Sequence, residues 1–237
     1  MIELNIKEIS DRRKEGTPLK PRPQAELFGC AIPSNKVLWE MENQSYEKTP
    51  KNNVLGWTLI EPSSKGIKAF INGNDIVIAI RGTADFRDVK ADLQIIFSGI
   101  TNSSRFKEDL KTLKEIQAKY PPEKYNYYSV SHSLGSAIAD ELINMGLIKS
   151  GVSYNGAVDL LKFKNDVRNH RIYNSDDILY NLMGRFTKNP EVRKNKLGWK
   201  GKIASLIPLG KLGNSINAHL LSNFVGGSLI GFHIILH

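Results

Sequence analysis

The spacing of apolar residues along the chain switches between two periods, one typical of helices and one typical of strands. At 35–46 and 105–119 apolar residues recur every three to four positions, which predicts two amphipathic helices. Short apolar runs at 56–60, 67–71 and 76–80 predict three strands. The last run, IVIAI, is apolar at every position, which is typical of a strand covered on both faces of a sheet.

The alternation of strands and helices continues in the second half of the chain. An aromatic and apolar run at 127–130 predicts a strand, and the spacing of apolar residues over 138–146 predicts a helix. Two further strands are predicted at 152–155 and 170–173. Such an alternation is characteristic of α/β layering. We therefore predict an α/β fold with a mostly parallel central sheet and flanking helices.

Length and local composition predict one domain that follows an extended arm. The chain has 237 residues, of which 41% are hydrophobic and 24% are charged. α/β domains of about this size fold as single units. Within residues 1–24, a charged stretch with three prolines and one glycine is typical of an extended segment. We expect a charged arm over 1–24 and a single domain over 25–237.

The sequence predicts neither a secretory signal peptide nor a transmembrane helix. Residues 1–16 mix charges and lack the apolar run of a signal peptide. The apolar run at 220–236 is interrupted by Asn223, His233 and small residues, which favours a place in the core. A single cysteine, Cys30, excludes a disulfide within these residues. These features favour an intracellular, soluble protein over a secreted one.

The candidate chemistry centres on Ser133. The pentapeptide SHSLG at 131–135 follows the predicted strand 127–130 and precedes the next helix. A serine nucleophile needs a sharp strand-to-helix turn with small residues two before and two after it, and Ser131 and Gly135 occupy these positions. Because Ser131 replaces the first glycine of G-x-S-x-G, the pentapeptide alone is compatible with a nucleophile and with an ordinary turn.

A second block, IVIAIRGTADFRDVKADL at 76–93, gives this turn a family context. Together with HSLG at 132–135 it resembles the class 3 lipases, whose sequences combine an apolar strand, R-G-T or R-G-S, a D-W-x-x-D-L tail and a later G-H-S-L-G. Val89 stands where the family has tryptophan, and Ser131 and Ser136 stand where it has glycine. The resemblance implies an α/β-hydrolase fold.

The same resemblance implies a catalytic triad. Ser133 is the implied nucleophile, Asp177 the acid and His219 the base, in the chain order of α/β-hydrolases. Asp176 is the alternative acid and His233 the alternative base. In such a triad the histidine takes the serine proton, and the ionised aspartate orients the histidine.

An oxyanion hole and a lid are also implied by the resemblance. The backbone N–H groups of Thr83 and Leu134 are the implied oxyanion donors. The candidate lid follows the Arg81-Gly82-Thr83 loop, and an apolar cluster there would favour lipid over soluble esters. Packing of this cluster in the core is the alternative. The cluster comprises Ile95, Ile96, Phe97 and Ile100.

Positive charge is concentrated in residues 185–202. The net charge of the chain is +9, and this segment contains seven Lys or Arg and one Glu. Because it would lie between the acid and the base, we hypothesise that it contacts anionic membrane. A solvated loop is the alternative, and no motif predicts a specific nucleic-acid partner. The candidate membrane contacts are Arg193, Lys194, Lys196, Trp199 and Lys200.

The functional hypothesis is a serine hydrolase that cleaves carboxylic esters of lipids, either triacylglycerol or phospholipid, through an acyl-enzyme on Ser133. The sequence contains neither HExxH nor CxxC, so no metal or other cofactor is predicted. The alternative is a catalytically weak hydrolase scaffold that binds anionic membrane or nucleic acid through its basic surface.

Overall fold

The structure is a computed structural model of the 237-residue chain. It describes residues 33–83, 99–158, 168–175, 177–183, 187 and 190–193. The predicted arm, residues 1–24, lies outside the described residues.

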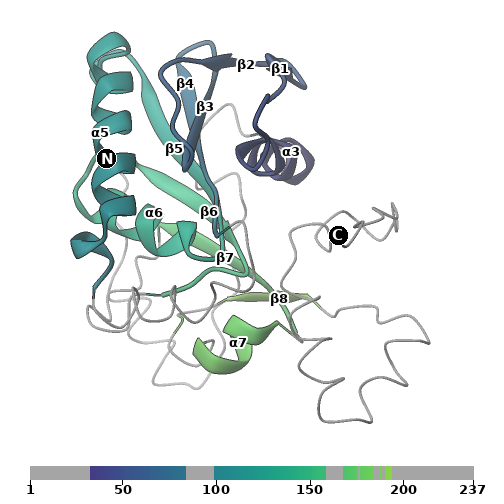
Figure 1. The fold of residues 1–237 in the computed structure, drawn as a ribbon. Coiled ribbons are helices and arrows are strands. Elements are labelled where there is room, and N and C mark those ends of the chain that lie inside the picture. The colour runs from purple at the N-terminus through teal and green to yellow at the C-terminus, as the bar shows by residue number, and fades with distance from the viewer. Residues whose placement is uncertain are drawn as a thin grey trace, which may run out of the picture.

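The described residues form one eight-stranded sheet with helices on both faces (Figure 1). The pairings from β1 to β4 are antiparallel, and those from β4 to β8 are parallel. The strands lie side by side in chain order: β1 (Asn53–Val54), β2 (Trp57–Ile60), β3 (Ile67–Asn72), β4 (Asp75–Ile80), β5 (Asn126–His132), β6 (Ser150–Tyr154), β7 (Asn169–Asn174) and β8 (Glu191–Arg193). The helices are α3 (Asn35–Ser45), η2 (Ile100–Asn102), α5 (Ser104–Lys119), α6 (Gly135–Asn144) and α7 (Ile178–Met183).

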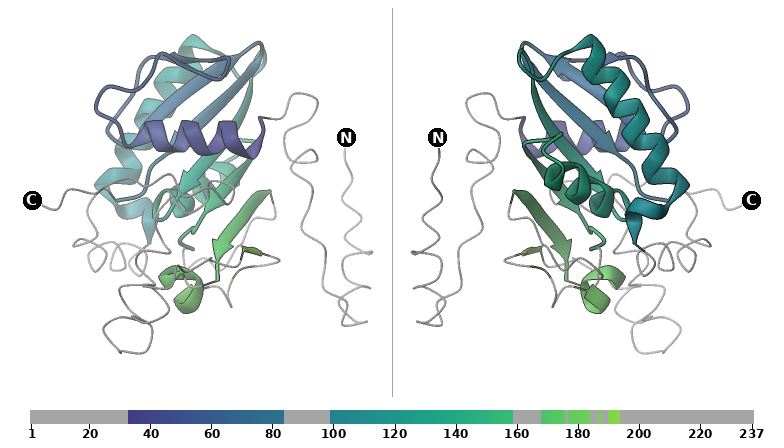
Figure 2. Two further views of the ribbon diagram at one scale, coloured as in Figure 1. Left: turned by 90° about the vertical axis from the view of Figure 1, so that its right-hand side faces the viewer. Right: turned by 90° about the vertical axis from the view of Figure 1, so that its left-hand side faces the viewer.

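Strand β4 shows why the sheet needs cover on both faces. Ile76, Ile78 and Ile80 pack in one core cluster with side chains of α5 and α6. Val77 and Ala79 pack in the other cluster, which includes side chains of α3. Successive side chains of a strand point to opposite faces, so a continuously apolar strand must be covered twice. Figure 2 shows α3 on one side of the sheet and α5 and α6 on the other.

Serine caps set the starts of the two longest helices. The Ser34 hydroxyl oxygen accepts the N–H of Val37 at 3.4 Å at the start of α3. The Ser103 hydroxyl oxygen accepts the N–H of Phe106 at 3.1 Å at the start of α5. Each cap satisfies an N–H that has no partner within the helix. Helix α5 ends two residues before Pro121, which cannot continue a helix.

The predicted helices and strands are confirmed, with differences of at most three residues at their ends. Strands β1 and β8 and helix α7 were not predicted, because each is too short to show a clear period. Strand β8 corrects the interpretation of 185–202 as a loop, since Glu191–Arg193 pairs with β7. The mostly parallel sheet with helices on both faces confirms the predicted α/β-hydrolase type of fold. No helix in the described ranges is both long and apolar enough to cross a bilayer.

Candidate active site

The candidate residues follow the carboxyl ends of parallel strands, which meet at one edge of the sheet. Strand β4 leads to Thr83, β5 to Ser133 and β7 to Asp177. In register, Ile80 of β4 lies beside Ser131 of β5, so the loop after β4 leaves the sheet next to Ser133. Sites in α/β sheets form outside this edge, where loops from several strands converge.

Ser133 stands in a turn between β5 and α6 and has a strained backbone. Its φ is +53°, a left-handed conformation that costs a non-glycine residue about 1–2 kcal/mol. Residues 127–132 and 134–140 are all buried, whereas Ser133 is partly exposed. The Ser133 N–H donates to the carbonyl oxygen of Tyr154 at 3.2 Å, and its carbonyl oxygen accepts the N–H of Ala157 at 2.9 Å. The turn is therefore held by β6 and by the residues that follow it, and Ser133 is its partly exposed residue.

Two glycines allow the loop after β4 to approach this turn closely. A Cβ at Gly135 would overlap the carbonyl oxygen of Ile80 and lie 2.8 Å from that of Arg81. A Cβ at Gly82 would lie 2.7 Å from the Cβ of Ser133. Because no side chain fits in either place, the packing of the loop against the turn requires both glycines.

Substitution of Gly135 tests this packing. We expect Gly135→Ala to lower the free energy of unfolding by about 3 kcal/mol, because the new Cβ meets backbone atoms that cannot rotate away. In the control Gly146→Ala no atom lies within 4 Å of the Cβ, and the φ of +74° alone costs about 1 kcal/mol. Denaturant unfolding followed by circular dichroism measures both variants. Equal losses would contradict the steric explanation.

Buried serine hydroxyls next to the turn are joined by hydrogen bonds. Ser131 and Ser136 are the two serines at positions where the lipase family has glycine. The Ser131 hydroxyl oxygen lies 2.8 Å from that of Ser153 and 3.3 Å from that of Ser136. Ser153 donates to the side-chain oxygen of Asn169 at 2.8 Å. The extra serine side chains are thus buried with polar partners, as buried hydroxyls require.

The hydroxyl network ends at a buried ion pair. Asn169 donates to Oδ1 of Asp140 at 2.7 Å, and the guanidinium of Arg171 donates to Oδ2 of Asp140. The Arg171 and Asp140 side chains are only 3% and 8% exposed. Arg171 also donates to the carbonyl oxygen of Ala157 at 3.3 Å. Since the N–H of Ala157 binds the carbonyl oxygen of Ser133, this ion pair supports the backbone beside the serine.

Asp177 lies three residues after β7, and its side chain is fully buried. Its Oδ1 accepts the N–H of Tyr180 at 2.8 Å, so the carboxylate caps α7. Its N–H donates to the carbonyl oxygen of Asn174 at 3.0 Å, and the N–H of Asn174 donates to Oδ1 of Asn155 at 2.9 Å. Only β6 separates β5, which leads to Ser133, from β7, which leads to Asp177, so these two strands lie about 10 Å apart in the sheet.

The two candidate oxyanion donors belong to segments that meet at Ser133. Leu134 precedes the first turn of α6, and in the described part of the chain its N–H donates to no acceptor. N–H groups at a helix start favour a neighbouring negative charge. Thr83 follows Gly82, whose close approach to Ser133 brings the loop after β4 to the same place.

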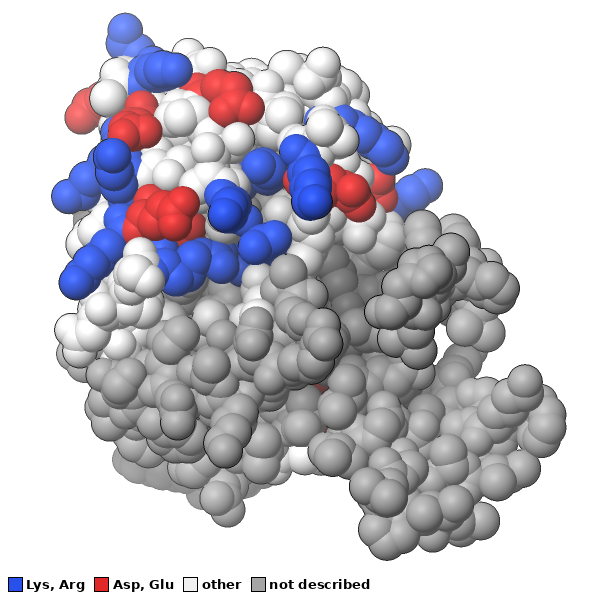
Figure 3. Space-filling model, in the orientation of Figure 1, with Lys and Arg blue, Asp and Glu red and all other residues white. Residues whose placement is uncertain are grey.

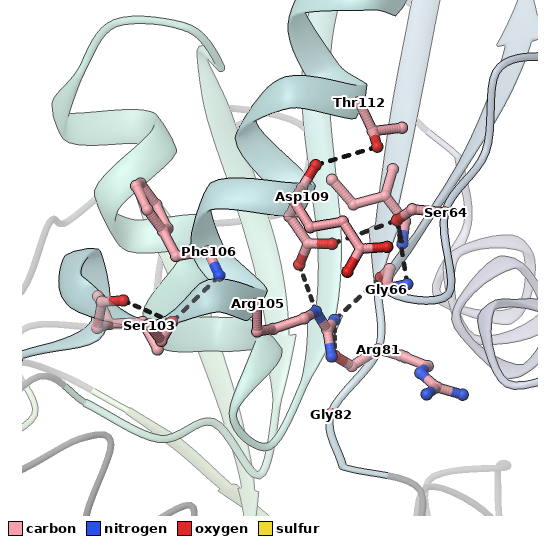
Figure 4. Close-up of polar contacts among 12 residues, drawn as sticks. Ser64, Gly66, Arg81, Gly82, Ser103, Arg105, Phe106, Asp109 and Thr112 are labelled. Carbon is pink, nitrogen blue, oxygen red and sulfur yellow. Dashed lines mark hydrogen bonds and ion pairs between the residues drawn. The ribbon is translucent and has the colours of Figure 1, made fainter.

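Arg105 of α5 anchors the loop after β4 (Figure 4). Its Nη2 donates to the carbonyl oxygens of Arg81 at 2.9 Å and of Gly66 at 3.2 Å. Its Nε donates to the fully buried Asp109 at 2.6 Å. Burial raises the pKa of Asp109, and the positive charge of Arg105 opposes this shift. The guanidinium therefore joins α5 to the backbone that leads to Gly82.

The structure describes only some of the predicted site residues. Ile100 lies in η2, where it is fully buried in the core cluster with Phe106. Arg193 ends β8, and its Nε pairs with a carboxylate oxygen of Glu191 at 2.7 Å. In the residues that the structure describes, no three His, Cys, Asp or Glu side chains gather as metal ligands. The candidates outside the described residues are Ile95, Ile96, Phe97, Asp176, Lys194, Lys196, Trp199, Lys200, His219 and His233.

Comparisons with known proteins give likenesses to solved structures only. No protein-family model and no curated protein matches the chain. The Lip2 lipase from Yarrowia lipolytica is 17% identical with a TM-score of 0.42, over 61% of this chain and 71% of the lipase. A mutant of MDLA from Penicillium cyclopium is 20% identical with a TM-score of 0.43, over 68% of this chain and 79% of that chain. A fungal lipase is 19% identical with a TM-score of 0.41, over the same shares.

Proposed function

We propose that the protein is a serine hydrolase that cleaves carboxylic ester bonds through an acyl-enzyme on Ser133. The observation that carries the proposal is the turn itself: a partly exposed serine at φ +53° between a strand and a helix, with buried residues on both sides. Strained conformations of this kind cluster at functional sites, where the surrounding structure holds them in place. The strand–turn–helix context is the one that a nucleophilic serine requires.

In the proposed reaction Ser133 attacks the ester carbonyl, and the base, His219 by resemblance, takes the hydroxyl proton. The same histidine then returns the proton to the leaving alcohol, while ionised Asp177 orients the imidazole and stabilises its charged form. The N–H groups of Leu134 and Thr83 stabilise the oxyanion, at about 3 kcal/mol for each donor. Water then attacks the acyl-enzyme in place of the alcohol, and the histidine takes a proton from it. The proton returns to Ser133 as the carboxylic acid leaves.

The proposed substrates are esters of lipids. This choice rests on the resemblance of the blocks at 76–93 and 132–135 to class 3 lipases. Of the candidate lid residues, Ile95, Ile96 and Phe97 would supply a surface for acyl chains, whereas Ile100 is buried in the core. We also propose that the basic segment 185–202 contacts anionic lipid, which would bring the enzyme to its substrate.

Labelling by a fluorophosphonate tests the proposal. An activated serine displaces fluoride and forms a stable phosphorus–oxygen bond, so mass spectrometry of the digested protein should find one adduct, on Ser133. Hydrolysis of p-nitrophenyl esters with short and long acyl chains, measured in parallel, should favour the long chain. Both labelling and turnover should be lost in His219→Ala and retained in His233→Ala, because the base activates the nucleophile.

Other outcomes separate the alternatives. If labelling and turnover were lost in His233→Ala and retained in His219→Ala, the base would be His233. A protein that forms no adduct and turns over neither ester, even with anionic vesicles present, would contradict the proposal and favour a binding scaffold. On the face shown in Figure 3, the described Lys and Arg side chains are interspersed with Asp and Glu, so this part of the surface gives the scaffold no basic patch.

A further inference from the structure

The hydroxyl of Tyr46 bridges two segments of the candidate site. Tyr46 follows α3 directly. The N–H of Gly82, in the loop after β4, donates to the Tyr46 hydroxyl oxygen at 2.8 Å. The same oxygen lies 2.7 Å from Nδ1 of His132, the last residue of β5 and the neighbour of Ser133. One side chain from a third element therefore joins the loop to the turn.

The direction of the two hydrogen bonds follows from their chemistry. A backbone N–H can only donate, so the Tyr46 oxygen is the acceptor of the bond from Gly82. Nδ1 of His132 is the one acceptor that the described residues offer to the Tyr46 hydroxyl proton. We therefore assign Nδ1 as the acceptor, which places the imidazole proton of His132 on Nε2. The bridge runs from the Gly82 amide through the hydroxyl to the imidazole.

The bridge lies where the loop and the turn are closest. A Cβ at Gly82 would lie 2.7 Å from the Cβ of Ser133, 2.9 Å from the carbonyl oxygen of His132 and 3.0 Å from the Tyr46 hydroxyl oxygen. The ring of Tyr46 meets that of His132 edge-on, with 6.0 Å between centroids. This ring contact does not depend on the hydroxyl, so phenylalanine would preserve it.

We propose that Tyr46 is a positioning residue for the proposed ester hydrolysis. Its hydroxyl fixes the loop after β4 against the turn, so that the N–H groups of Thr83 and Leu134 are held at one oxyanion site. The inference rests on the proposed function. Preorganised donors act on the transition state, and a misplacement of 1 Å can reduce the rate about 100-fold. Loss of the hydroxyl should therefore lower kcat and leave KM nearly unchanged.

The test compares Tyr46→Phe with Tyr127→Phe. Tyr127 is also a tyrosine with a hydrogen-bonded hydroxyl, which donates to the carbonyl oxygen of Tyr120, but it lies at the opposite end of β5. With p-nitrophenyl esters, we expect kcat of Tyr46→Phe to fall about 10- to 100-fold at constant KM. The kcat of Tyr127→Phe should stay within about twofold of the unmodified protein, because its hydroxyl is remote from the oxyanion site.

Nuclear magnetic resonance gives a second readout that needs no turnover. Hydrogen exchange of the Gly82 amide should become about tenfold faster in Tyr46→Phe and not in Tyr127→Phe, because its acceptor is gone. Nitrogen shifts of His132 should show the Nε2–H tautomer in the unmodified protein.

The outcomes separate the inference from the proposed function. An active protein whose Tyr46→Phe variant keeps its kcat would overturn the inference alone. An unmodified protein without turnover would overturn the proposed function, and unchanged Gly82 exchange would then also overturn the positioning role of Tyr46.

Discussion

Replacement of Ser133 by alanine is expected to reduce ester turnover about a million-fold, because the remaining groups bind and polarise the ester but cannot form the acyl-enzyme. Initial rates with a p-nitrophenyl ester measure the loss. The backbone should remain unchanged, since alanine keeps the strained φ of +53°. Turnover that survives in Ser133→Ala would place the nucleophile elsewhere.

Ser133→Gly separates catalysis from strain at the same position. It should be as inactive as Ser133→Ala, yet more stable by about 0.5–1 kcal/mol, because glycine adopts a positive φ without steric cost and loses part of this gain through the entropy of its unfolded state. Denaturant unfolding compares the two variants. Equal stability of the two variants would contradict the strain described at this position.

Asp140→Asn is expected to lower the free energy of unfolding by about 3–5 kcal/mol, because it leaves the buried guanidinium of Arg171 without a counter-charge. The turn at Ser133 should also be perturbed, since Arg171 donates to the carbonyl oxygen of Ala157, whose N–H binds the carbonyl oxygen of Ser133. Denaturant unfolding measures stability, and fluorophosphonate labelling at low denaturant measures the state of the turn.

An exposed ion pair on α5 provides the control. Nζ of Lys111 lies 3.9 Å from Oε1 of Glu115, and the two side chains are 79% and 49% exposed. Glu115→Gln should change stability by less than about 0.5 kcal/mol, since water screens such pairs. If Asp140→Asn were no more destabilising than Glu115→Gln, the buried pair would not support the fold as described.

The sequence was informative about the fold wherever an element was long enough to show a period. Helix α5 repeats its apolar positions over several turns, and β4 is apolar at every position after Asp75, so both were predictable. Strand β8 has three residues and a polar residue at each end, which gives a single-sequence pattern nothing to detect. Its pairing depends on the neighbouring strand β7 rather than on its own composition.

The motifs of the candidate site were predictable from the sequence, but the buried polar residues that hold it in place were not. Ser133 and Thr83 stand in recognisable sequence blocks. Arg105 and Asp109 left a weaker signal, since opposite charges four residues apart face one another on a helix. Asp140 pairs with Arg171 from another element, and no local pattern announces a contact between residues so distant in the sequence. Buried polar partners of this kind become visible only when the elements are assembled.

The bond from Arg105 to the carbonyl oxygen of Arg81 also ties together two residues that are 24 positions apart in the sequence. Arg81 directly follows β4, and Arg105, whose side chain donates to the Arg81 carbonyl oxygen, lies in the first turn of α5. The entropic cost of closing a loop grows only with the logarithm of its length, by about 0.6 kcal/mol per doubling. Insertions or deletions between these two residues would perturb the sheet very little. The length of this connection can therefore change during evolution while the geometry of the sheet edge stays constant.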